Sequence, residues 1–247
     1  MAVCIAGLRL IESYRYDCIA GFRDALWNKA NFLVNSSTKK QCSSSNPPFG
    51  YVGFIPTLCG GWTNGNKHDH SVYLTFDDGP IPESTPFILE TLARYNALAT
   101  FFMVGQNVER HPHLYRQILD AGHRVGNHTY NHMGGARHTI RTYSDNARQA
   151  DELIHSHLFR PPHGWMRLSQ YAWLSRKYKV VMWDVVTRDY SKWMTAEDVL
   201  NNVKRYTRNG SIITFHDSLK SIDKLRFALP QALQWLKEQG YEFKTID

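Results

Sequence analysis

The chain has 247 residues, of which 43% are hydrophobic and 21% charged, a globular composition that excludes disorder along its whole length. No stretch approaches the roughly 18 uninterrupted apolar residues of a membrane-spanning helix. The net charge of +7 is spread along the chain, so it predicts solubility and no nucleic-acid partner. The apolar start, residues 1–8, has no basic segment before it and is short for a signal-peptide core, so no signal peptide is predicted.

The first seventy residues differ from the rest of the chain. Residues 5–33 have a loose helical periodicity, and residues 35–65 are rich in Ser, Asn, Gly and Pro, which is typical of loops. We therefore predict an N-terminal extension of mixed helix and loop over residues 1–70 and a main domain over residues 71–247. The spacing of the cysteines matches no CxxC pattern and leaves disulfides and free thiols equally open; all four lie in the extension: Cys4, Cys18, Cys42 and Cys59.

From residue 71 onward, seven apolar strand-like runs alternate with six helical runs. The strands are expected at 72–76, 99–103, 123–125, 158–159, 179–183, 211–215 and 241–245. The helices are expected at 84–95, 113–121, 139–155, 168–178, 195–206 and 223–239, the fifth with a capping box of Thr195 and Asp198. Strict alternation predicts a parallel sheet with helical crossovers, either an open sheet or a barrel. No Gly-rich dinucleotide motif follows the first strand, which disfavours a Rossmann fold.

Titratable side chains collect after five of these strands. Because the carboxyl ends of parallel strands meet at one edge, that edge is where active sites of such folds are built. Five such positions in succession are hard to explain by packing. The residues are Asp77 and Asp78, then His128 and His132, then Arg160, then Asp189, and finally His216.

A metal site is one interpretation of the first two groups. The i, i+4 spacing of His128 and His132 would place both imidazoles on one face of a helical turn. Asp77 and Asp78 are adjacent in a strand, so their side chains should diverge, one toward a metal and the other toward its water. The alternatives are surface histidines and a capped Asp-Gly-Pro turn. Two imidazoles and one carboxylate leave coordination positions open, as in catalytic zinc sites, and also describe the iron triad of oxygenases.

Three motifs together resemble a known family. Thr-Phe-Asp-Asp-Gly-Pro at 75–80, His-Thr-Tyr-Asn-His at 128–132 and Arg-Pro-Pro at 160–162 are similar to motifs of the NodB-type polysaccharide deacetylases, carbohydrate esterase family 4. The resemblance covers roughly residues 71–247. It implies a distorted (β/α)7 barrel, in the α/β class, and a divalent metal that is usually zinc, with cobalt and nickel as alternatives.

The resemblance also implies roles for individual residues. Asp78, His128 and His132 would bind the metal, Asp77 would be the general base, and His216 the general acid. Arg160 would hold the base, and Asp189 would orient the acid. The residues implied in substrate binding lie near these positions: His163 (through its backbone N–H), Trp165, Tyr190, Ile213 and Thr214.

Some positions depart from the family pattern. Tyr190 stands where Trp is usual, Thr214 where Leu is usual, and His163 where Tyr is frequent, which leaves the acyl group and substrate open. The expected reaction is removal of N-acetyl groups from an N-acetylglucosamine polysaccharide, either peptidoglycan or a chitin-like polymer. The alternatives are an O-acetyl esterase acting on xylan or another glycan and an inactive glycan-binding module. The family implies a location outside the cytoplasm; the oligomeric state stays open.

Overall fold

The computed structural model describes residue 65 and residues 68–247. The predicted N-terminal extension, with its helix, its loops and its four cysteines, therefore lies almost wholly outside the described residues. Within the described part, no helix is both long enough and apolar enough to cross a bilayer.

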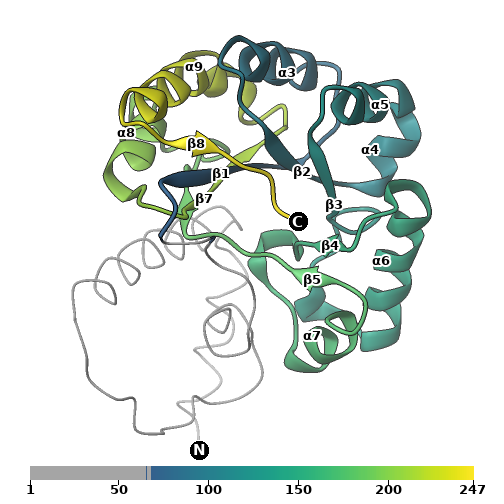
Figure 1. Cartoon of the computed structure of the whole chain (residues 1–247). Coiled ribbons are helices and arrows are strands. Elements are labelled where there is room, and N and C mark those ends of the chain that lie inside the picture. Colours follow the sequence, from purple (N-terminus) through teal and green to yellow (C-terminus); the bar gives the residue numbers. More distant parts are fainter. Residues whose placement is uncertain (1–64, 66–67) are drawn as a thin grey trace, which may run out of the picture. The chain divides into compact units, whose positions relative to one another are not determined.

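The centre of the described part is a curled parallel sheet (Figure 1). Its strands follow the spatial order β5-β4-β3-β2-β1-β7-β6, and β8 pairs with β1 outside that path. The edge strands β5 and β6 do not pair with each other, so the barrel is incomplete, as expected for a distorted (β/α)7 barrel. The strands are β1 (Ser71–Asp78), β2 (Ala99–Met103), β3 (Arg124–Asn127), β4 (Leu158–Phe159), β5 (Lys179–Val180), β6 (Val185–Val186), β7 (Ile212–His216) and β8 (Glu242–Phe243).

The helices surround the strands on the outside (Figure 1). They are α3 (Thr85–Arg94), α4 (Gly105–Arg110), α5 (Pro112–Asp120), α6 (Ile140–Ile154), α7 (Leu168–Leu174), α8 (Ala196–Tyr206) and α9 (Ile222–Glu238), with short 3-10 turns η1 (Gly135–Arg137) and η2 (Pro162–Gly164). The predicted capping box at α8 is confirmed, because the side chain of Thr195 accepts from the amide of Asp198 and that of Asp198 accepts from the amide of Thr195.

Two parts of the predicted element order were wrong. The sequence pattern gave no helix at residues 105–110, where α4 lies. It also gave one strand over residues 179–183, where the structure has the two-residue strand β5 and then a separate strand, β6, across the sheet. The chain passes from β5 to β6 without a helix, so the strict alternation of strands and helices fails there.

Side chains along each strand alternate between the helices and the barrel interior. On β1, the side chains of Leu74 and Phe76 pack toward the helices. Tyr73 instead joins an interior cluster that includes Phe102 and Ile246. This alternation places the polar side chains at the carboxyl end of β1 and β7 inside the barrel, where they form the site.

Candidate active site

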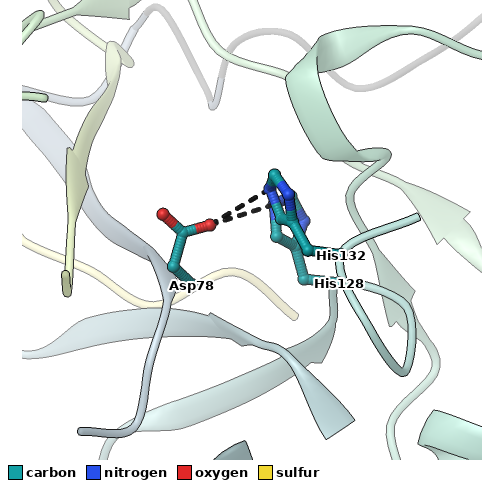
Figure 2. Close-up of side chains that lie close together, drawn as sticks. All are labelled: Asp78, His128 and His132. Carbon is teal, nitrogen blue, oxygen red and sulfur yellow. Dashed lines mark ion pairs between the residues drawn. The ribbon is translucent and has the colours of Figure 1, made fainter. Parts of the chain in front are cut away.

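Three side chains, one from the end of β1 and two from the loop after β3, converge at the carboxyl edge of the sheet (Figure 2). Asp78 is the last residue of β1, His128 follows β3 directly, and His132 lies in the loop after it. Oδ1 of Asp78 lies 3.2 Å from Nε2 of His132 and 3.8 Å from Nε2 of His128. One ligand atom from each residue lies within 4.8 Å of the other two, which is close enough for one ion to contact all three.

The backbone conformation, and not a helix, brings the two histidines together. Residues 128–134 form a loop, so the helical turn considered from the i, i+4 spacing is not present. Thr129 has φ of 65° and His132 has φ of 57°, both in the left-handed region that non-glycine residues rarely adopt. The hydroxyl of Thr129 accepts from the amide of Met133 and closes the turn (2.8 Å). Asp78, with φ of 83°, has the same rare conformation.

The chemistry of these donors fits a divalent cation of the zinc type. Oδ1 of Asp78 is buried and makes no hydrogen bond among the described residues. Burial raises the pKa of Asp78, but the hydrogen-bonding imidazole of His132 and the charges of His216 and His128 outweigh it and hold the pKa well below its usual range. Burial holds the pKa of His128 well below its usual value, so its ring is neutral. Nδ1 of His128 lies 2.7 Å from the carbonyl of Arg160, an acceptor that keeps the proton on Nδ1 and leaves Nε2 free to coordinate.

Asp77 lies one residue before Asp78 and points into the barrel interior. Nη1 of Arg160 donates to its Oδ1 at 2.6 Å, and the carboxylate is only 3% exposed. Burial raises the pKa of Asp77, and the positive charges of Arg160 and His216 offset part of that rise. The arginine therefore holds the carboxylate in one orientation.

Arg160 is fully buried and is held on every side. Its guanidinium lies 4.0 Å from the ring centroid of Phe102, and Nη2 donates to the carbonyl of Met182 (2.9 Å). Nη1 also donates to the hydroxyls of Thr75 (2.8 Å) and Thr214 (3.3 Å). These partners hold the buried guanidinium in one position, and its hydrogen bond therefore also fixes the orientation of the Asp77 carboxylate.

His216 ends β7, beside Asp77 in the register of β1 and β7. Its Nδ1 lies 2.8 Å from Oδ1 of the buried Asp189, and its amide donates to Oδ2 (2.7 Å). Burial alone would lower the pKa of His216, but the Asp189 carboxylate outweighs it and, with the charges of Asp78 and Asp77, raises that pKa to about 9. Lys224 of α9 donates to the carbonyl of Asp189 (2.8 Å) and fixes its loop.

The predicted substrate-binding residues differ in how close they lie to the proposed acid and metal ligands. The half-buried Tyr190 makes an edge-type ring contact with His216, with centroids 4.6 Å apart. The exposed His163 makes the same kind of contact with His132, also at 4.6 Å. Trp165 is half-buried just after η2. Thr214 is inside the barrel, but its hydroxyl belongs to the Arg160 network.

Ile213 is not brought to the site. It points away from the interior, into the cluster between the sheet and the helices that also contains Phe215. Strand alternation is the reason, because Ile213 precedes Thr214 and so lies on the opposite face of β7 from His216.

Two further polar residues near the site were missed or left without a role. Asp217 is buried and accepts from the hydroxyls of Ser84 and Thr85 (2.6 Å for Thr85), and its amide donates to the carbonyl of Asp77 (2.7 Å). Burial raises the pKa of Asp217 to about 7. Asn107 of α4 donates to the carbonyl of Asp78 (2.8 Å). The hydrogen-bond partners of Asp217 and Asn107 lie far from them in the sequence, so no periodic pattern could have predicted these bonds.

Comparison with known proteins identifies the family. The polysaccharide deacetylase family model matches residues 64–180. The chain is 33% identical to a peptidoglycan-N-acetylglucosamine deacetylase of Bacillus cereus over 188 residues, which cover 73% of this chain and 88% of that relative. It is 34% identical to a second protein of that name from the same organism over 195 residues, which cover 74% of this chain and 69% of the relative.

A solved structure supports the same conclusion. The crystal structure of a peptidoglycan N-acetylglucosamine deacetylase superposes with a TM-score of 0.68 at 33% identity, covering 74% of this chain and 89% of that one. Fold, site and relatives together define a polysaccharide deacetylase. Within that class, the chain belongs to the NodB-type family, carbohydrate esterase family 4.

Proposed function

We propose that this deacetylase removes the N-acetyl group from N-acetylglucosamine units of peptidoglycan in a metal-dependent hydrolysis. The observation that carries the proposal is the placement of Asp77 and His216 side by side on β1 and β7, next to the three-residue cluster of Asp78, His128 and His132. A base and an acid beside one electrophilic centre are what amide hydrolysis requires. Deacetylase membership favours this reaction over the iron-oxygenase alternative.

Asp78, His128 and His132 are the residues that would hold the cation, and one carboxylate with two imidazoles is a ligand set that suits zinc. A divalent cation bound there would lower the pKa of a bound water to about 7 and polarise the acetyl carbonyl. Asp78 supplies the only formal negative charge of the three ligands, since the pKa shifts keep it ionised and keep His128 neutral.

The two groups beside the cluster move the protons. The Asp77 carboxylate takes a proton from the attacking water through Oδ2, because Arg160 holds Oδ1. The water oxygen bonds to the acetyl carbon, and the carbon–nitrogen bond then breaks. Nε2 of His216 gives its proton to the departing amine, while Asp189 holds Nδ1. Acetate and a free glucosamine amine are the products.

Removal of the Asp189 charge is expected to move the alkaline limb of the pH–kcat profile. His216 acts as an acid only while protonated, and Asp189 raises its pKa. In Asp189→Asn that pKa falls, so the protonated fraction is lost at lower pH. The alkaline limb should move acidward by about 1–3 pH units. A profile with an unmoved alkaline limb would show that His216 is not the acid or that Asp189 does not tune it.

The polymer is proposed from the named relatives, which are peptidoglycan-N-acetylglucosamine deacetylases. An O-acetyl esterase is the second candidate, because Tyr190 beside His216 and Thr214 beside Arg160 replace the usual family residues. The test compares acetate release from peptidoglycan, chitin oligomers and acetylated xylan, with free amine measured in parallel. Equal acetate and amine from peptidoglycan support the proposal. Acetate from xylan alone would replace it with the esterase.

A further inference from the structure

A short segment at the start of α4 is bonded to the loop that carries Asp78. The amide of Val104 donates to the carbonyl of Gly79 at 3.1 Å. The side-chain amide of Asn107 donates to the carbonyl of Asp78 itself at 2.8 Å. Asp78 has φ of 83°, a conformation with a steric cost for a residue with a Cβ. The Asn107 side chain therefore bonds directly to the backbone of the residue that carries this conformation.

The same segment is bonded to the loop that carries the two histidines. The amide of Gly105 donates to the carbonyl of Thr129 (3.0 Å), and the amide of Gln106 donates to that of Tyr130 (2.8 Å). A Cβ on Gly105 would lie 2.8 Å from Cδ2 and 3.1 Å from Cα of Tyr130, so the contact admits no larger residue without displacement. Residues 104–107 thus touch both ligand loops, and we call them the α4 bridge.

We infer that Asn107 is a positioning residue for the metal site. Through the α4 bridge, it holds Asp78 in its left-handed conformation and at its distance from His128 and His132. Among the four bridge residues, Asn107 alone donates to a ligand loop through its side chain; the other three bonds are from backbone amides. The inference rests on the proposed function, because only a metal-dependent enzyme requires Asp78, His128 and His132 to be held at fixed distances.

The test is the metal affinity of Asn107→Leu and Asn107→Ala. Both variants remove the donor, and both replacements are better helix formers than Asn, so α4 itself is not weakened. Gln106→Ala is the matched control, because it truncates the neighbouring side chain and keeps the backbone donor to Tyr130. Zinc dissociation constants are measured on the chelator-stripped full chain by competition with a chromophoric chelator. Melting temperatures of the stripped proteins are measured alongside.

Each Asn107 variant should bind zinc about 10–100-fold more weakly, the usual effect of losing a partner of a metal ligand. Gln106→Ala should bind as the wild type does, and excess zinc should restore much of the lost activity of the Asn107 variants. Wild-type zinc affinity in either folded Asn107 variant would overturn the inference. Failure of both to fold would also overturn it, because Asn107 would then be a stability residue. A wild-type protein that binds no zinc would instead overturn the proposed function.

Discussion

Asp77→Asn should lose about 10²–10⁴-fold in kcat while binding metal as the wild type does. The amide has nearly the same shape, and its oxygen can still accept from Nη1 of Arg160. It cannot take a proton from water, so the base step is lost. The ligand cluster of Asp78, His128 and His132 does not include Asp77 and should stay intact. Acetate release and zinc stoichiometry, measured on the same preparation, check the two halves of this expectation.

A second buried carboxylate offers a matched control. Asp184 is also paired with an arginine, Arg208 at 3.1 Å, and accepts from the amide of Ile212. It lies beside the opposite end of β7 from His216. Asp184→Asn should therefore lower stability while leaving kcat near the wild-type value. If Asp77→Asn keeps wild-type turnover, or Asp184→Asn loses as much, Asp77 is not the base.

His216→Ala is expected to lose about 10²–10⁴-fold in kcat on N-acetyl substrates and much less on an aryl acetate. An amine must be protonated as it departs, whereas a phenolate leaves without that help. The loss of activity in His216→Ala should therefore depend on the leaving group. A general loss of structure would lower the activity on both substrates equally. Steady-state kinetics on chitin oligomers and on an aryl acetate give the comparison.

His70→Ala is the matched control for the loss of an imidazole. His70 is hydrogen-bonded to Asn209 and to the carbonyl of Gln239, and it stacks on Tyr241. None of these contacts involves the site, so both substrates should be turned over at the wild-type rate. Equal losses on both substrates in His216→Ala would contradict its role as the acid.

The pH profile of the wild type should be bell-shaped under this account. The acidic limb reports ionisation of Asp77, whose pKa burial raises above the ordinary carboxylate value. The alkaline limb reports deprotonation of His216, whose pKa is about 9 in the metal-free protein. A cation at Asp78 adds positive charge near both groups and lowers both pKa values. Both limbs of the metal-loaded enzyme, which is the form expected to be active, should therefore lie at lower pH than the pKa values of Asp77 and His216 in the metal-free protein.

Long apolar strands and periodic helices were predictable from the sequence. Strands β1, β2 and β7 and helices α6, α8 and α9 lie within two residues of their expected bounds. These elements are long or strongly periodic, so burial alone specifies them. Helix α4 was not predictable, because its six residues, Gly105–Arg110, have one buried apolar side chain and no N-cap side-chain bond. Strand β6 has only two residues, and only its pairing with β7 defines it.

The site was predictable as a set of residues but not as a geometry. Their positions after strands indicated that one of Asp77 and Asp78 would meet His128 and His132, and the family resemblance implied Asp78. The structure brings Asp78 to the two histidines. The i, i+4 spacing suggested a helical turn, and the left-handed residues that replace it carry no sequence signature. Strand alternation places the side chains of Ile213 and Thr214 on opposite faces of β7, so the two cannot both line the barrel interior. The contact of Asn107 with Asp78 spans 29 positions and depends on α4, so no local pattern could reveal it.

The most direct test of metal-dependent deacetylation is acetate release by the chelator-stripped protein, with and without added zinc or cobalt. The substrates are peptidoglycan and N-acetylglucosamine oligomers, and a His132→Ala variant is the control for the proposed ligand site. We expect no acetate from stripped protein, restoration by one equivalent of metal per chain, and no restoration in His132→Ala. Full acetate release by the stripped wild type, or no metal binding by it, would contradict metal-dependent deacetylation at this site.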